Sequence, residues 1–243
     1  MKLYIIRHAQ STNNALANQK DRVCDPELTE LGHQQAKVVA EHLAHGVDPE
    51  YVVGVSEEDT AADSRQGYKI DHLYCSAMHR SMLTAKPISE ALGLTPEVWI
   101  DIHEHGGIFL DHGGEKGIVG YPGKRRSDIL AEFPNYTLPP TVTDEGWWRM
   151  ENGKEDWPGC HGRAIRVYRT LRERAPSREN IAIVTHGGFM DALMKAITNQ
   201  LPNPSLIYHH YNTSITRVDF RPDGKTDLRY INRFDHLPAE MIS

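Results

Sequence analysis

Residues 4–14 have the sequence YIIRHAQSTNN, a short apolar run that ends at a cation and an imidazole, Arg7 and His8. An apolar run of this length, rich in β-branched residues, is typical of a buried strand. Similar runs recur along the chain, and we expect strands at 2–7, 69–76, 181–186, 214–220 and 227–232. These strands are numerous enough to form one sheet, with the Arg7-His8 pair at the end of the first.

Helical patterns lie between these strands, and we expect helices at 28–45, 80–93, 162–175 and 189–200. Thr29 is expected to cap the first helix and Gly46 to follow its end, while Pro87 is expected to bend the second helix or to mark its restart. The last two strands are joined by the turn-forming stretch RPDGKT and should form a hairpin. Strands that alternate with helices predict an α/β fold, a three-layer α/β/α sandwich with a mostly parallel central sheet.

The 243 residues fit one domain, 1–243, which can close around a single large core. Two long interruptions, at about 47–67 and 106–159, predict insertions on that domain. The first contains the polar stretch SEEDTAADSRQG and is expected to be a surface loop. The second is rich in Gly, Pro and aromatic residues and has one short helical pattern, RRSDILAEF. A segment so long and aromatic is expected to form a lid or a pocket wall.

Composition excludes several classes of protein. The net charge is −6 and no long basic block appears, which disfavours nucleic-acid binding. No apolar run is long enough to span a bilayer and the N-terminus lacks a signal-peptide pattern, so we expect no membrane contact and a cytoplasmic location. The cysteines, Cys24, Cys75 and Cys160, are expected to be free thiols. A homodimer is compatible with the sequence, but no feature requires one.

Polar groups follow three of the expected strands. Arg7 and His8 end the first, Arg80 lies just beyond the second, and His186 ends the third before a Gly187-Gly188 turn. In an open α/β sheet, ligands bind beyond the carboxyl ends of parallel strands, so these groups should meet in one place. Arginine matches phosphate oxygens and keeps its charge, a helix N-terminus favours an anion, and a neutral imidazole can attack phosphorus. The pattern predicts a phosphoryl-transfer site.

Four sequence blocks resemble the motifs of the histidine phosphatase superfamily, the phosphoglycerate mutase-like enzymes, in the order in which that family has them. They are RHAQSTNN, DPELTELGHQQA, CSAMHRSMLTA and VTHGG. The resemblance implies that His8 is the phosphorylated nucleophile. It also implies that a second group of residues binds the phosphoryl group, and these are Arg7, Arg80, His186, Gly187, Ser11, Asn14 and Gln10. The chain departs from the family pattern at Ala9, where Gly is usual, and at Gln10, where Glu is commoner.

The family also supplies a carboxylic acid that protonates the leaving group, and here the segment VWIDIHEHGGIF is the candidate. We expect Glu104 to take this role, with Asp101 as the alternative, because the usual spacing from Glu to Gly is not reproduced. A nearby phosphate dianion favours the protonated carboxyl, so activity should favour mildly acidic to neutral pH.

The expected activity is hydrolysis of a small phosphorylated metabolite through a phosphohistidine, without metal or other cofactor. One alternative is mutase-type phosphoryl transfer, which the absence of a Glu-x-x-Tyr-Gly pattern after Asp101 disfavours. Another is a catalytically silent phosphate-binding domain. A metal site is a third, because several potential ligands lie close together in the sequence, namely Asp101, His103, Glu104, His105, Asp111 and His112. Their spacing matches no known ligand pattern.

Overall fold

The computed structural model describes residues 1–49 and 67–243. Within these residues a six-stranded sheet has the order β3-β2-β6-β1-β7-β8. The strands are β1 (Lys2–Arg7), β2 (His72–Cys75), β3 (Glu97–Val98), β6 (Asn180–Thr185), β7 (Ile215–Phe220) and β8 (Thr226–Arg233). The pairs β3-β2, β2-β6 and β6-β1 are parallel, whereas β7 pairs antiparallel with β1 and with β8. The predicted mostly parallel sheet and the C-terminal hairpin are therefore confirmed.

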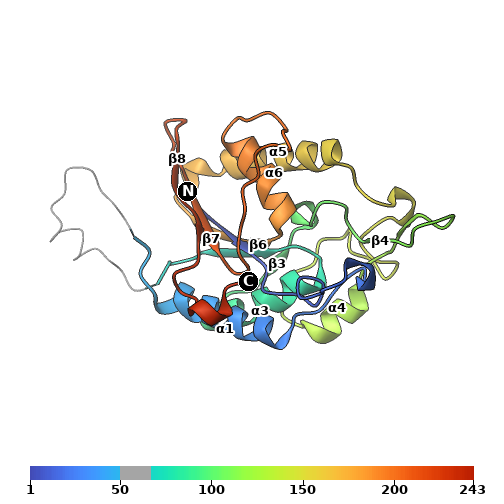
Figure 1. Cartoon of the computed structure of the whole chain (residues 1–243). Helices are drawn as coiled ribbons and strands as arrows, with labels where there is room; N and C mark the ends of the chain where they lie inside the picture. The colour runs from blue at the N-terminus through green and yellow to red at the C-terminus, as the bar shows by residue number, and fades with distance from the viewer. Residues whose placement is uncertain (50–66) are drawn as a thin grey trace, which may run out of the picture.

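Helices cover both faces of the sheet (Figure 1). They are α1 (Glu30–His45), α3 (His79–Leu92), α4 (Arg126–Glu132), α5 (Trp157–Glu173) and α6 (Gly187–Ile197). Short 3-10 turns lie between the main elements, and these are η1 (Gln19–Asp21), η2 (Ile100–Ile102), η3 (Met150–Asn152), η4 (Ala175–Ser177) and η5 (Ala239–Met241). The result is the three-layer arrangement that the alternating pattern predicts.

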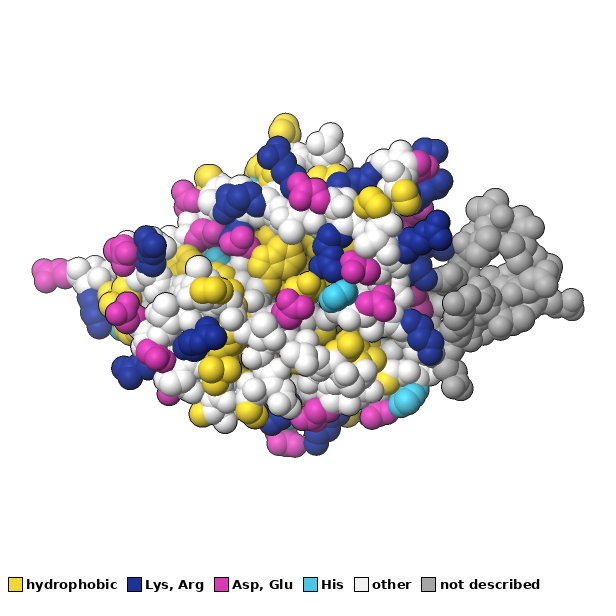
Figure 2. Space-filling model, turned by 180° about the vertical axis from the view of Figure 1, so that it is seen from behind, with side chains coloured by type: hydrophobic (Ala, Val, Ile, Leu, Met, Phe, Trp, Pro, Cys, Tyr) yellow, Lys and Arg dark blue, Asp and Glu magenta, His cyan; other side chains and the backbone are white. Residues whose placement is uncertain are grey.

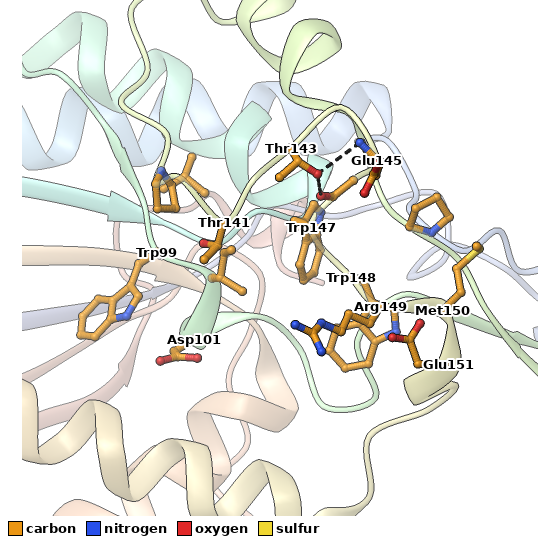
Figure 3. A pocket seen from close by; sticks show the side chains of 15 residues that line it. Trp99, Asp101, Thr141, Thr143, Glu145, Trp147, Trp148, Arg149, Met150 and Glu151 are labelled. Carbon is orange, nitrogen blue, oxygen red and sulfur yellow. Dashed lines mark hydrogen bonds between the residues drawn. The ribbon is translucent and has the colours of Figure 1, made fainter.

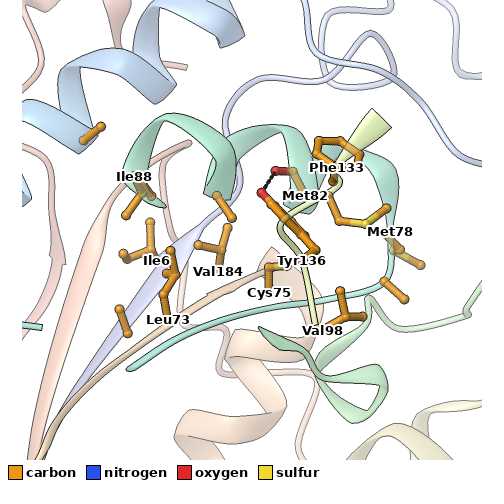
Figure 4. Close-up of a cluster of buried hydrophobic side chains, with 14 of the residues drawn as sticks. Ile6, Leu73, Cys75, Met78, Met82, Ile88, Val98, Phe133, Tyr136 and Val184 are labelled. Carbon is orange, nitrogen blue, oxygen red and sulfur yellow. Dashed lines mark hydrogen bonds between the residues drawn. The ribbon is translucent and has the colours of Figure 1, made fainter. Parts of the chain in front are cut away.

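The sheet divides the core into two hydrophobic clusters because successive strand residues point to opposite faces. In β1, Tyr4 and Ile6 join the cluster under α1, α3 and α4, whereas Leu3 and Ile5 join the one under α5 and α6. Figure 4 shows the first cluster, where side chains of α3 pack on strand residues and the Tyr136 hydroxyl donates to the Met82 carbonyl at 2.8 Å. Strand β1, buried on both faces, therefore has apolar residues at every central position.

The first helix follows the sequence prediction closely. The Thr29 hydroxyl accepts a hydrogen bond from the Gly32 N–H at 3.0 Å, and α1 ends before Gly46. Its buried stripe includes Ala36, Val39 and Leu43, which face the sheet. Helix α3 continues through Pro87 as one element, so no restart occurs there.

Several predicted boundaries are wrong. Strand β2 begins at His72 and not at 69, because Lys69 has a positive φ of 52°, which a strand does not accommodate. Helix α5 begins five residues before the predicted 162, with Asp156 accepting from the Gly159 N–H. Helix α6 spans Gly187–Ile197 instead of 189–200, and Asn199, with φ of 56°, lies beyond its end.

The predicted insertion at 47–67 lies, apart from its ends, outside the described residues. The insertion at 106–159 contains α4 and a β-hairpin formed by β4 (Phe109–Asp111) and β5 (Ile118–Gly120). This hairpin was not predicted. Side chains of the insertion and of 98–101 line a cavity of about 830 Å³, which Figure 3 shows with Trp147 and Trp148 in its wall. The part of the insertion around 141–151 thus forms a pocket wall.

Candidate active site

The ends of β1, β2 and β6 bring the predicted site residues together. His8 follows β1, Arg80 lies in the first turn of α3, and His186 is the residue before α6. The His8 and His186 ring centroids are 5.0 Å apart, and the Arg80 Nε donates to His8 Nε2 at 3.1 Å. His8, Arg80 and His186 are all buried. The register of three parallel strands therefore brings these residues together, although His8 and His186 are 178 positions apart in the chain.

Two hydrogen bonds define the tautomer of His8. Its Nδ1 lies 2.7 Å from the Ala9 carbonyl oxygen, which can only accept, so Nδ1 carries the proton. Its Nε2 faces the Nε–H of Arg80, which can only donate, so Nε2 presents its lone pair. Burial, reinforced by Arg80 and Arg7, holds the His8 pKa well below its ordinary value. His8 is therefore a neutral imidazole with its lone pair at Nε2, the form that a nucleophile needs.

Two buried nitrogens of the cluster have no hydrogen-bond partner among the described residues, namely the Nε of Arg7, which is a donor, and the Nδ1 of His186, which is a donor when the Ser76 hydroxyl donates to Nε2. The other nitrogens of these groups are occupied. Arg7 Nη1 donates to the His210 carbonyl at 2.6 Å, and His186 Nε2 lies 2.6 Å from the Ser76 hydroxyl. A buried donor without a partner costs about 1–3 kcal/mol, so an oxyanion placed among these groups would be bound favourably.

Glu104 lies at the N-terminus of α6. Its Oε1 accepts from the Phe189 N–H at 2.9 Å and from the His105 N–H at 2.8 Å, and its Oε2 accepts from the Gly188 N–H at 3.2 Å. A Cβ at position 188 would lie 2.7 Å from Glu104 Oε1, so a side chain there would displace the carboxylate from its present position. Burial lowers the pKa of Arg7 and of Arg80, and the Glu104 carboxylate opposes that shift at both guanidinium groups.

Asp101 has a different environment, although it was the alternative acid. It lines the 830 Å³ cavity of the insertion, where Figure 3 shows it beside Trp99, with Trp148 and Arg149 across the cavity. The structure thus places Glu104 with the cluster of His8, Arg80 and His186, and Asp101 in a separate cavity.

The loop after His8 differs from the expectation in detail. The Ser11 hydroxyl donates to Asn14 Oδ1 at 2.9 Å, so these two predicted phosphate ligands bond each other. Gln10 was also expected to contact phosphate, but its side-chain Oε1 accepts from the Thr29 hydroxyl at 2.7 Å. This contact ties the loop to the N-terminus of α1. Gly187 lies against Arg7, since a Cβ at this glycine would be 3.5 Å from Arg7 Nε.

Sequence reasoning gives no role to Ser76 or Arg163, which support the cluster, and it indicates Asn212 only as a candidate neighbour of the pocket. Ser76 contacts His186, and Asn212 Nδ2 donates to the His8 carbonyl at 2.7 Å. Arg163 of α5 donates from Nη1 to the carbonyls of Asp101 and His103, both at 2.8 Å, and thereby holds the segment that carries Glu104. Ser76 is the last residue of a predicted strand, which is a usable signal, whereas no local pattern marks Arg163.

The suggested metal site does not form from the histidines after Asp101. His105 stacks on Trp157 with ring centroids 3.8 Å apart, and His103 Nδ1 lies 2.8 Å from the Glu104 carbonyl. Within residues 1–49 and 67–243, no three His, Cys, Asp or Glu side chains gather as metal ligands would.

Comparison with known proteins shows which family this chain resembles. The model of the histidine phosphatase superfamily (branch 1) matches residues 3–57 and 52–233. The chain belongs to this family. Phosphoserine phosphatase 1 of Hydrogenobacter thermophilus is 33% identical over 203 residues, which cover 81% of this chain and 76% of the relative. A second protein of that organism, putative phosphoserine phosphatase 2, is 25% identical over 236 residues and 97% of each chain.

Solved structures of histidine phosphatases share the fold. A phosphoserine phosphatase of Entamoeba histolytica, solved with phosphoserine, has a TM-score of 0.58 at 20% identity and covers 98% of this chain and 99% of its own. A mycobacterial glucosyl-3-phosphoglycerate phosphatase, solved with VO3, has a TM-score of 0.56 at 21% identity and covers 96% of this chain and 99% of its own.

Across the described residues, no helix is both long and apolar enough to cross a membrane.

Over the face seen in Figure 2, acidic and basic side chains are interspersed. A protein that binds nucleic acid commonly concentrates its cations in one patch or stripe. On this face several Lys and Arg side chains gather at the right-hand edge with Asp and Glu among them, and Arg80 of the candidate active site is buried.

Proposed function

We propose that this histidine phosphatase hydrolyses the phosphate monoester of a small metabolite through a phosphohistidine at His8, without a metal ion. The observation that supports this most strongly is the arrangement around His8 Nε2. Its lone pair faces Arg80 Nε at 3.1 Å, and the ring of His186 lies 5.0 Å from that of His8, centroid to centroid. The donor Arg7 Nε and the Nδ1 of His186 are buried without a partner among the described residues. Three equatorial phosphoryl oxygens would give these donors partners, with Arg80 supplying further N–H groups.

In the first step, His8 Nε2 forms a bond to phosphorus while the bond from phosphorus to the ester oxygen breaks. Arg80 exchanges its hydrogen bond to Nε2 for one to a phosphoryl oxygen, which frees the lone pair to attack. Glu104, protonated, gives its proton to the departing oxygen. The carboxylate then takes a proton from water as the water oxygen attacks phosphorus, which restores neutral His8 and releases inorganic phosphate.

Phosphoserine is the first natural substrate to assay, because two curated relatives bear the name phosphoserine phosphatase. Steady-state hydrolysis of phosphoserine and of p-nitrophenyl phosphate is measured in excess EDTA between pH 5 and 8, for the native chain and for His8→Ala. We expect hydrolysis of p-nitrophenyl phosphate to survive chelation and to be lost in the variant, whereas the rate with phosphoserine tests whether this chain shares the substrate in the names of those relatives. Acid-labile, base-stable labelling of the native chain in rapid-quench experiments would identify the phosphohistidine directly.

Equal activity of the native chain and His8→Ala would show that His8 is not the nucleophile. Rapid labelling of His8 with transfer of the phosphoryl group to a second substrate hydroxyl, and little release of phosphate, would indicate a mutase instead. Binding of inorganic phosphate without labelling or turnover would indicate a silent binding domain.

A further inference from the structure

A cavity of about 930 Å³ opens beside the N-terminus of α6. Its lining begins at Arg7, Gly187 and Gly188, which belong to the candidate active site, and extends along α5 and α6. Figure 1 shows these two helices side by side on one face of the sheet. The volume is that of a typical small-molecule site. The cavity is therefore a continuation of the catalytic centre, with room for much more than a phosphoryl group.

The apolar side chains of this lining come from two parts of the chain, which form two walls. Helix α5 contributes Trp157 and Ile165, and the segment after α6 contributes Pro202, Pro204 and Ile207. Trp157, Ile165 and Ile207 are 46%, 43% and 54% exposed, respectively. Apolar side chains so exposed, gathered in one concave place, indicate a surface that buries an apolar group.

The aromatic wall is coupled to the candidate acid. His105 follows Glu104 in the chain, and its ring stacks on Trp157 with centroids 3.8 Å apart and an interplanar angle of 7°. Trp157 in turn lines the cavity. A group bound against this wall would thus lie near the carboxyl that protonates the leaving oxygen. The cavity thus adjoins the proposed phosphoryl-binding groups at Arg7 and Gly187, and it reaches Gly188, whose N–H donates to Glu104.

The charged residues of the lining compensate one another. Lys195 donates to Asp191 Oδ2 at 2.7 Å and to the Asn203 carbonyl at 2.9 Å, and both members of this ion pair are buried. Burial, aided by Lys195, lowers the pKa of His161, so this histidine is neutral near pH 7. Apart from Arg7, the described lining has no uncompensated cation that would attract a second anionic group.

We propose that this cavity holds the leaving group of the substrate and selects an uncharged, largely apolar alcohol with at least one ring. This inference rests on the proposed phosphatase activity, because the leaving group is defined by that reaction. It distinguishes this chain from an enzyme that recognises a carboxylate-bearing leaving group such as serine.

The test compares two esters whose leaving alcohols have similar intrinsic reactivity, ethyl phosphate and 2-phenylethyl phosphate. For the native chain, we expect kcat/KM to be at least about tenfold higher for the phenylethyl ester, because burying a phenyl ring removes a large apolar area from water. Ile165→Asp and Ile207→Asp, one on each wall, should bring that ratio down to about one. Ile118→Asp is the matched control, since Ile118 is similarly exposed at 48% but lies in β5, outside the lining.

The outcomes separate the two proposals. Equal kcat/KM for both esters, with activity that requires His8, would overturn the leaving-group site and leave the phosphatase standing. No hydrolysis of either ester, nor of p-nitrophenyl phosphate, would overturn the phosphatase and this inference with it. A native dimer that Ile165→Asp converts to a monomer, with an unchanged ester ratio, would show that a second copy of the chain covers these walls instead.

Discussion

Glu104 and Asp101 are three residues apart, yet the fold gives them different environments. Glu104 accepts hydrogen bonds from the α6 N-terminus beside the catalytic cluster, whereas Asp101 lines the cavity of the insertion. We expect Glu104→Gln to lower kcat for an alkyl phosphate by on the order of 10²–10⁴-fold, because Gln cannot protonate the leaving oxygen. Asp101→Asn should change kcat by less than about twofold, since Asp101 has no part in the transfer of that proton.

The leaving group provides an internal control for this prediction. A nitrophenolate departs without protonation, so p-nitrophenyl phosphate should lose much less activity than an alkyl phosphate in Glu104→Gln. Steady-state assays of both esters measure the difference. A large loss in Asp101→Asn together with a small one in Glu104→Gln would reverse the assignment.

At the scale of elements, Arg163 joins α5 to the segment that carries Glu104. It is 2% exposed, donates to two carbonyls of 101–103, pairs with both oxygens of Glu155 at 2.6 and 2.9 Å, and lies over the Phe189 ring at 4.7 Å. We expect Arg163→Met to lower the free energy of unfolding by about 3 kcal/mol, because it leaves Glu155, whose side chain is only 14% exposed, without its partner. Urea denaturation measures this loss.

The same substitution should lower kcat, because the loop before Glu104 loses two of its hydrogen bonds and the carboxyl is held less firmly. The double variant Arg163→Met/Glu155→Met removes the unpaired charge and should recover part of the stability but not the kcat. If kcat and its pH profile stay native while stability falls, Arg163 has a structural role alone.

The element boundaries show what local sequence can predict. Thr29 and Gly46 mark α1 because capping depends on a few adjacent residues. The start of α5 was placed too late, although Asp156 followed by Trp157-Pro158 is a good helix start, since proline suits the first turn. Strand β3 has only two residues, and its pairing with β2 provides the order that its sequence lacks.

In the candidate site too, local sequence predicts some contacts and not others. Arg7, His8, Arg80 and His186 could be predicted because strand ends in a parallel sheet meet at one edge, whatever separates them in sequence. Arg163 contacts carbonyls 60 and 62 residues away, a relation that depends on where α5 packs and that no motif encodes. Gln10 stands where the family more often has Glu, and its side chain turns to Thr29 through a contact that only the folded loop creates.

At the scale of the whole molecule, buried neutral histidines make stability depend on pH. Burial lowers the pKa of His103 to about 3 and that of His210 to about 4, against an ordinary value near 6.5 in the unfolded chain. Below about pH 6.5 the unfolded chain therefore binds protons that the folded chain does not, so this contribution to stability is complete above that pH and is lost as the pH falls. Each of these histidines should cost about 1.4 kcal/mol per pH unit between roughly pH 6 and pH 5.

Urea denaturation at pH 7, 6 and 5 measures this slope, in a range above the ordinary pKa of most carboxylates. His103→Asn keeps a side-chain donor for the Glu104 carbonyl but cannot be protonated. We expect this variant to be less stable than the native chain at pH 7. Its free energy of unfolding should also fall less steeply with falling pH, by about 1.4 kcal/mol per pH unit. The two curves should therefore converge as the pH falls. Parallel curves for the native chain and His103→Asn would mean that His103 is already protonated in the folded state, and that burial between Trp147, Trp148 and Arg163 does not keep it neutral.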